Sequence, residues 1–223
     1  GHQLVSVDFS QVEFRVLAAL ANEPQMIAAF AAGHDLHDVT ATVLFGPEFT
    51  PAQRRLAKGT GFGLVYGGGR DTLARQAGVT KTEATIAIDK FKRSFPRIGR
   101  WSTSVTEAIK YGDPLVITAT GRRIPVDRQF AYRAVNYEIQ SAAADIFKGS
   151  LLELDAAGFG DHLLLPIHDE IIAQAPEATA AEMAADMAST MSGRLGPVPI
   201  TAAAEVIGAA WGDKYQDREV AHA

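Results

Sequence analysis

The sequence predicts an α+β fold in which one antiparallel sheet is built from both ends of the chain. Strand-like segments rich in β-branched residues lie at residues 4–9, 163–173 and 199–211. Residues 23–112 show helical periodicity and turn signals but no strand pattern. The strands are too few and too scattered for a doubly wound parallel sheet. We therefore expect a sheet interrupted by a helical insertion.

Several of the expected helices have a clear start signal. Ser10 and Glu13 have the spacing of a capping box, so a helix should directly follow the first strand. Thr50 before Pro51 predicts a helix that runs to about residue 66, where three glycines end it. A second capping box spans Thr80 to Glu83. The remaining helices are expected at about 80–95, 98–111, 129–156 and 176–195.

The composition narrows the class of protein. The chain has 223 residues, of which 47% are hydrophobic, enough for one large domain or two small ones. No apolar run approaches the length of a membrane helix, and no signal peptide is visible, so we expect a cytoplasmic protein without a membrane partner. The absence of cysteine excludes disulfides, thiolate metal sites and a cysteine nucleophile.

The charge is unevenly distributed along the chain. The net charge of −5 argues mildly against non-specific binding of nucleic acid by the whole chain. Lysine and arginine nevertheless crowd residues 54–133, between more acidic ends. Such a basic middle could serve a phosphate-rich ligand, although a solvated helical face explains the charge equally simply.

Four residues on the helix expected after Pro51 form a stripe of two cations and two aromatics. Arg54, Lys58, Phe62 and Tyr66 are four residues apart and share one face. The cations could hold phosphate oxygens, and the aromatics could pack on a sugar and a base. The alternative is a surface stripe whose aromatic end docks on the core.

The same helix contains three glycines, at positions 59, 61 and 63. Each destabilises a helix interior by about 1 kcal/mol relative to alanine. Their presence in five residues indicates either close approach of a ligand to the backbone or a helix that must bend.

Asp8 and Asp169 each lie at the end of a strand-like segment. Carboxylates with few other protein ligands suit Mg²⁺ that is shared with substrate phosphates, and a pair of such ions can activate one oxygen and stabilise another. If the first strand pairs beside the hairpin that carries Asp169, the two carboxylates converge. Each aspartate alone would be an ordinary turn residue.

A polar line is expected on the helix at 129–156. Arg133, Asn136 and Gln140 share one face, and their donors could reach acceptors in a nucleic-acid minor groove. An exposed polar helix face is the simpler explanation. His34 and His37 have a possible metal spacing, but no further soft ligands join them, so we exclude zinc.

Three motifs together closely resemble the family A DNA polymerases, of the DNA polymerase I type, from bacteria or phages. They are "DFSQVEFR" at Asp8–Arg15, "RRLAKGTGFGLVYG" at Arg54–Gly67 and "IHDE" at Ile167–Glu170. The connecting segments "FKRSFPRIGRW" and "TATGRRIP" are also similar to that family. The resemblance covers essentially the whole chain, and three ordered motifs make it specific.

The resemblance implies a palm domain at residues 1–22 and 129–223 and a fingers domain at 23–128. The thumb and exonuclease domains of the family have no counterpart here, so we expect a palm–fingers fragment of a longer polymerase. A missing thumb and exonuclease portion is then a possible partner of the chain. Primer–template DNA and deoxynucleoside triphosphates are the other implied partners.

The resemblance also implies a role for each motif residue. Two Mg²⁺ ions would be bound by Asp8 and Asp169, with Glu170 near them. Lys58 would contact the triphosphate and donate a proton to pyrophosphate. The implied nucleotide contacts are Arg54, Lys58, Phe62, Tyr66, His37, Gln11 and Glu13, with Glu13 as the steric gate against a 2′-hydroxyl. The implied DNA contacts are His168, Arg133, Asn136 and Gln140.

The sequence departs from the family pattern at two places. Arg133 is three residues before Asn136, whereas the family commonly has four, and this puts its role in question. Gly59 and Gly61 replace better helix formers.

The leading hypothesis is a template-directed DNA polymerase core that transfers a nucleotide to a primer 3′ end by a two-metal mechanism. One alternative is a nucleotide- or DNA-binding module without turnover. The other is a two-metal phosphohydrolase, which would explain Asp8 and Asp169 but not the stripe from Arg54 to Tyr66.

Overall fold

The computed structural model describes residues 1–65 and 69–213, which belong to two compact units. The first, which we call the sheet unit, comprises residues 1–12, 143–195 and 199–213. The second, the helical unit, comprises residues 13–65, 69–142 and 196–198. The predicted α+β class is confirmed, because an antiparallel sheet and a long helical segment are both present.

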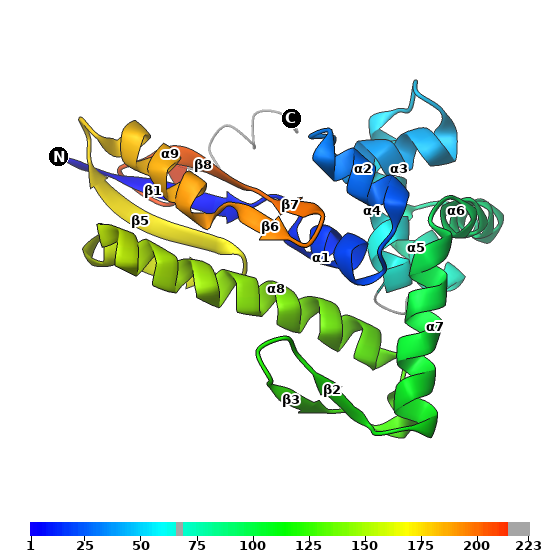
Figure 1. The fold of residues 1–223 in the computed structure, drawn as a ribbon. Helices are drawn as coiled ribbons and strands as arrows, with labels where there is room; N and C mark the ends of the chain where they lie inside the picture. The colour runs from blue at the N-terminus through cyan, green and yellow to red at the C-terminus, as the bar shows by residue number, and fades with distance from the viewer. Residues whose placement is uncertain (66–68, 214–223) are drawn as a thin grey trace. The chain divides into compact units, whose positions relative to one another are not determined.

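The sheet unit is organised around a four-stranded antiparallel sheet (Figure 1). Its strands, in order across the sheet, are β4 (Leu163–Ile167), β5 (Glu170–Pro176), β1 (His2–Phe9) and β8 (Ala202–Gly208). The first strand of the chain is thus paired on both sides by strands from the other end. This confirms the expectation of a sheet built from both ends of the sequence.

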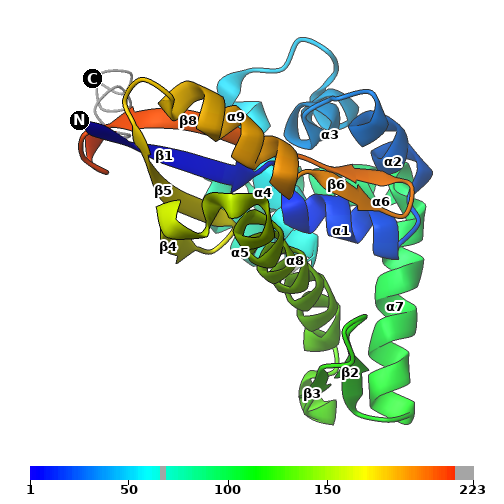
Figure 2. The ribbon, with the colours of Figure 1, turned by 60° about the vertical axis from the view of Figure 1, so that its left-hand side comes forward.

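Burial explains why β1 occupies an inner position. Val5 and Val7 are fully buried and Phe9 nearly so, and the intervening Ser6 is buried as well. A strand whose successive residues are buried has both faces covered. One cover is the helix α9 (Ala180–Met191), which contacts β8, β1 and β5 (Figure 2).

The helical unit is made mainly of helices that pack on their sequence neighbours. The helices of this part of the chain are α1 (Val12–Leu20), α2 (Pro24–Ala31), α3 (Leu36–Phe45), α4 (Pro51–Val65), α5 (Arg70–Ala77), α6 (Lys81–Ser94) and α7 (Pro96–Tyr111). A short hairpin of β2 (Leu115–Ile117) and β3 (Arg123–Pro125) follows, and then the long α8 (Arg133–Leu154). One apolar cluster joins α4, α5 and α6 through Leu56, Leu73, Ala74, Ala84 and Ile88.

The helices α4 and α6 each begin with a capping box, at Thr50 and at Thr80. The Thr50 amide donates to the Gln53 side chain at 2.7 Å, and the Gln53 amide donates to the Thr50 hydroxyl at 3.2 Å. Thr80 and Glu83 exchange the same pair of hydrogen bonds at the start of α6. The N-termini of α4 and α6 are therefore fixed by the local signals that predicted them.

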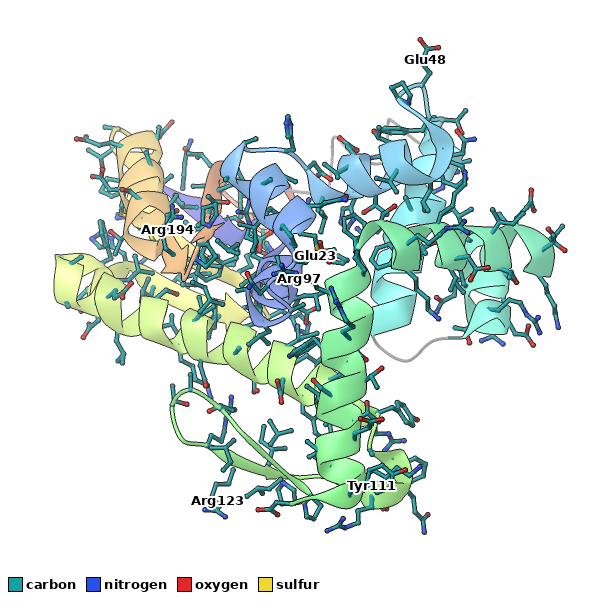
Figure 3. All side chains as sticks on the ribbon, turned by 45° about the vertical axis from the view of Figure 1, so that its right-hand side comes forward. Glu23, Glu48, Arg97, Tyr111, Arg123 and Arg194 are labelled. Atoms are coloured by element: carbon teal, nitrogen blue, oxygen red, sulfur yellow. The ribbon has the colours of Figure 1, made fainter. Side chains whose placement is uncertain are left out.

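A buried carboxylate links two further helix starts. Glu23 is only 1% exposed, and it accepts hydrogen bonds from the backbone amides of Gln25 at 3.4 Å and Arg97 at 2.9 Å. The Arg97 guanidinium donates in turn to the Asn22 carbonyl at 2.8 Å (Figure 3). The Glu23 carboxylate thus accepts from amides in the first turns of both α2 and α7. At these helix starts the amides lack partners within the helix, and the helix dipole favours an anion.

The structure differs from the sequence prediction at several helix ends. The helix expected to start at residue 176 begins at Ala180. The helix expected at 176–195 ends at Met191, and the next residues form the ribbon of β6 (Gly193–Leu195) and β7 (Val198–Ile200). The turn of this ribbon contains Gly196 at φ 56°, a conformation that glycine adopts easily.

The helix expected from residue 129 begins at Arg133. Asp127 caps a separate 3₁₀ turn at Arg128–Phe130 by accepting from the Gln129 amide at 2.9 Å, and α8 starts only after it. After α8 ends at Leu154, a π-helical turn at Asp155–Phe159 contains Gly158 at φ 91°, a conformation that commonly terminates a helix.

Candidate functional site

The acidic residues of the first and third motifs meet at one end of the sheet. Asp8 is paired with Glu170 across the β1–β5 ladder. The Phe9 amide donates to the Asp169 carbonyl at 3.1 Å, which ties the end of β1 to the two-residue turn between β4 and β5. The sheet therefore brings Asp8, Asp169 and Glu170 to the same edge of the same unit.

The turn itself has an unusual backbone. His168, its first residue, is exposed and has φ 54°, a left-handed conformation that is uncommon for residues other than glycine, although histidine adopts it more often than most. Such a conformation costs of order 1 kcal/mol and is often found at functional sites. The sequence predicted the hairpin tip but gave no signal for this conformation.

Glu170 is oriented by the neighbouring strand. Its Oε1 accepts a hydrogen bond from the hydroxyl of Ser6, which is buried on β1. Ser6 and Asp8 are two residues apart and so point to the same face of the sheet. Glu170 thus lies on the face to which Asp8 points.

The carboxylates at this edge suit a hard divalent cation whose remaining ligands come from elsewhere. Asp8 is exposed and Asp169 is half-buried, so both are accessible to a ligand. Over residues 1–65 and 69–213, no group of three or more histidine or acidic side chains is placed to hold a metal by itself. Mg²⁺ commonly uses one or two carboxylates together with substrate phosphates, and these residues fit that mode of binding.

The second motif places Arg54 and Lys58 on α4 in the helical unit. Lys58 is exposed. Arg54 is half-buried and forms ion pairs with Asp35, at 3.1 Å, and with Asp38 on α3. The hydrogen bond to Asp38 is the main cause that raises the pKa of Arg54. The guanidinium is therefore permanently charged and held by two acids.

Asp35 is also the N-cap of α3. Burial acts to raise the pKa of its carboxyl, but hydrogen bonds from the amides of Asp38 and His37 and the nearby His37 ring oppose it, and the net effect lowers the pKa. The nearby Arg54 acts in the same direction. Asp35 is thus ionised in the folded chain and serves both the helix and the guanidinium.

His37 is more buried than its predicted role suggests. Its ring is 7% exposed and meets the ring of Phe14 edge-on, with the centroids 5.4 Å apart. Burial lowers its pKa; Asp35 opposes this, whereas Lys58 and Arg54 reinforce it. These electrostatic interactions place His37, Arg54 and Lys58 in one cluster, in which the histidine is neutral at neutral pH.

The aromatic half of the stripe cannot be described in the same way. Phe62 belongs to α4, but its side chain and the whole of Tyr66 lie outside the described residues. Gly61 can be described: a Cβ there would lie 3.1 Å from Cζ of Phe14. The glycine allows α4 to pack closely on Phe14, so the close approach is to a core side chain and not to a ligand.

Gln11 and Glu13 lie where β1 passes into α1. Gln11 is half-buried and left-handed, with φ 54°, and the preceding Ser10 amide donates to the Thr201 carbonyl at 2.8 Å. Glu13 is half-buried in the first turn of α1. The turn between β1 and α1 is therefore held by this backbone hydrogen bond, and it contains no glycine.

The polar line lies on the first turns of α8. Arg133 is exposed and its guanidinium carbon sits 4.3 Å from the centre of the Phe130 ring, a cation–π contact. Gln140 is exposed. Asn136 is half-buried, and its Oδ1 is shielded from water yet accepts no hydrogen bond from any described residue. A buried acceptor without a partner among the described residues is rare in folded proteins.

Comparison with known proteins now defines the family. Residues 1–213 match the model of DNA polymerase family A. The DNA polymerase of Mycobacterium phage D29 is 41% identical over 217 residues, which cover 96% of this chain and 36% of that protein. The thermostable DNA polymerase I of Thermus thermophilus is 36% identical over 201 residues, 83% of this chain and 24% of that protein.

A solved structure agrees with these matches. The polymerase domain of Pol1 from M. smegmatis, in complex with DNA primer–template and dNTP, matches 95% of this chain and 40% of its own with a TM-score of 0.83 and 29% identity. The chain belongs to DNA polymerase family A, as its three motifs predicted. It spans little more than a third of the length of the phage relative.

No described helix is both long and apolar enough to cross a bilayer.

Proposed function

We propose that the chain is the catalytic core of a template-directed DNA polymerase, which adds deoxynucleotides to a primer 3′ end. The observation that carries this proposal is the meeting of Asp8, Asp169 and Glu170 at one end of the sheet. Asp8 and Asp169 would hold two Mg²⁺ ions, which in such a site activate the attacking oxygen and stabilise the leaving one.

The other residues of the site would bind and position the substrates. Arg54 and Lys58 would hold the phosphate oxygens of a deoxynucleoside triphosphate, and the ammonium of Lys58 is exposed and able to give a proton to the departing pyrophosphate. His37 is neutral and buried, so its contribution would be a hydrogen bond or support for its neighbours and not a positive charge. Phe62, Tyr66, Gln11 and Glu13 remain predicted contacts of the nucleotide.

Primer–template DNA would contact α8 and the hairpin tip. Exposed Arg133, Gln140 and His168, and the unsatisfied Oδ1 of Asn136, supply groups for it. The Pol1 relative was solved with primer–template and dNTP, which supports both partners. The palm at 1–22 and 129–223, the fingers at 23–128, and a place in the cytoplasm of a bacterium or phage-infected host belong to the same proposal.

Primer extension tests the proposal. We expect the chain, with Mg²⁺ at low salt, to extend a primer, and Asp169→Asn to lower the rate at least about a hundredfold, the usual effect of losing one charge-stabilising group. Asp161→Asn removes an exposed acid from the same unit and serves as the matched control. Equal extension by wild type and Asp169→Asn would overturn the assignment.

A binding module without turnover is the second candidate, because the chain spans only part of its relatives. It predicts that the wild-type chain binds primer–template or nucleotide but extends nothing. Hydrolysis of DNA that depends on Asp8 would instead favour the phosphohydrolase alternative.

A further inference from the structure

The ion pairs of Arg54 occupy one side of its guanidinium, the side formed by Nε and Nη2. The Nε of Arg54 donates to Asp38, and one terminal nitrogen donates to Asp35 at 3.1 Å. A guanidinium binds carboxylate and phosphate through the same planar fork of donors. A phosphate that binds this side of the guanidinium must therefore share or displace these two carboxylates.

Asp35 and Asp38 have different structural roles. Asp35 accepts the amides of His37, at 2.7 Å, and Asp38, at 3.2 Å, and thereby starts α3. Asp38 lies in the first turn of α3, where an acid is favoured, but its side chain caps no amide; within the described part of the chain its carboxylate pairs with Arg54. Asp38 is thus the acid that can release Arg54 without uncapping α3.

The cluster is open to a dissolved ligand. The side chains of Arg54 and Asp38 are 39% and 49% exposed. Asp35 and Asp38 also line an open hollow of about 360 Å³ on the surface of the helical unit. An exposed ion pair of this kind is weak, so a polyanion can outcompete it.

We infer that Asp38 is a positioning residue that competes with the nucleotide triphosphate for Arg54. With the site empty, Asp38 holds the guanidinium in place; when a triphosphate arrives, its oxygens take over the Nε donor. The competition by Asp38 therefore lowers the affinity of the chain for the nucleotide. This inference rests on the proposed contact of Arg54 with the triphosphate.

A double-mutant cycle on nucleotide affinity tests the inference. The Kd for dATP would be measured by calorimetry at low salt for wild type, Asp38→Asn, Arg54→Ala and the double variant. We expect Asp38→Asn to lower the Kd about two- to fivefold, the factor that corresponds to an exposed ion pair. In the Arg54→Ala background the same substitution should change the Kd by no more than the control substitution does.

Asp71→Asn is the matched control for general charge effects. Asp71 is an exposed acid of the same unit, and it pairs with Arg70 and Lys81, each at 3.2 Å, outside the proposed site. Asp38→Glu, which keeps the carboxylate, should have the Kd of the wild type. Circular dichroism of each variant shows that α3 is intact.

The outcomes separate the inference from the proposed function. If Arg54→Ala weakens binding but Asp38→Asn does not tighten it beyond Asp71→Asn, the competition is refuted and the nucleotide site stands. Equal tightening by Asp38→Asn with and without Arg54 refutes it as well, because the effect is then through space. If dATP does not bind to the wild type, or binds independently of Arg54, the nucleotide contact itself is wrong and the inference falls with it.

Discussion

Burial determines the chemistry of His37. Its pKa is lowered from the ordinary value of 6.5, chiefly by desolvation. The unfolded chain therefore binds a proton at a higher pH than the folded chain does. Stability is then fully present above about 6.5 and is lost as the pH falls from there toward the folded pKa.

We accordingly predict that the free energy of unfolding decreases below about pH 6.5 and that His37→Gln flattens this dependence. The measurement is urea unfolding between pH 5 and 8. The slope with pH is the readout, because glutamine in a buried site lowers stability at every pH. His34→Gln, at an exposed position of the loop before α3, should keep the wild-type slope; an unchanged slope in His37→Gln would refute the prediction.

The sequence motifs predicted where the acidic residues of the sheet unit lie. They did not predict the electrostatic interactions of His37 and Arg54 in the helical unit. Strand alternation and the order of the motifs were enough to predict that Asp8 and Asp169 lie at strand ends that could meet, and the sheet brings them to one edge. The burial of His37 and the pairing of Arg54 with Asp38 depend on how α3 packs on α4. Contacts of that kind have no local signal, because the residues that form them are 16 or more positions apart or belong to different helices.

At the scale of elements, the local capping signals at Thr50 and Thr80 are confirmed, whereas the spacing at Ser10 did not predict that α1 begins only at Val12, after left-handed Gln11. Long-range caps had no sequence signal. The boxes at Thr50 and Thr80 need only residues within one turn, so the sequence contains the whole interaction. Glu23 caps α7 from 74 positions away. The premature end of α9 at Met191 has the same origin, since the β6–β7 ribbon is defined by pairing and not by helix propensity.

Glu23 gives the sharpest prediction for the helices. We expect Glu23→Ala to lower the free energy of unfolding by about 2–4 kcal/mol, because the starts of α2 and α7 lose one shared acceptor in a buried site. Chemical denaturation measures the change. Glu48→Ala, at an exposed loop position labelled in Figure 3, should stay within about 0.5 kcal/mol of wild type. A loss at Glu23 no larger than that at Glu48 would contradict the assigned role.

The glycines of α4 are predicted to respond differently to alanine. A Cβ at Gly61 would crowd the ring of Phe14, with atoms at 3.1 and 3.2 Å, whereas at Gly63 no described atom lies within 4 Å. Gly63→Ala should therefore raise the free energy of unfolding by about 0.5–1 kcal/mol through helix propensity. Gly61→Ala should gain clearly less or lose stability. Thermal unfolding of both variants decides the order, and a larger gain at Gly61 would be inconsistent with the packing.

At the scale of the whole molecule, the sheet unit depends on segments from opposite ends of the chain. β1 is bounded by β5 on one side and β8 on the other. Removing β8 would leave the backbone groups of β1 without partners along one side and create an exposed edge.

We predict that a chain ended after Ile200 loses cooperative unfolding of the sheet unit and self-associates, because unpaired strand edges template aggregation. A chain ended after Asp213 keeps β8 and is the matched control. Sedimentation velocity and circular dichroism provide the readouts. A monomeric, cooperatively unfolding chain without β8 would show that β1 does not need this neighbour.

The central position of β1 also has a consequence for synthesis on the ribosome. Asp8 pairs with Glu170 and Phe9 with Ala202, so β1 is synthesised about 160 to 190 residues before the strands that flank it. At translation rates of about 5–20 residues per second, that interval is on the order of ten seconds or more. Throughout it, the side chains of Val5, Val7 and Phe9, which end up buried, have no sheet to enter. Asp8, Asp169 and Glu170 therefore come together only after β5 has emerged.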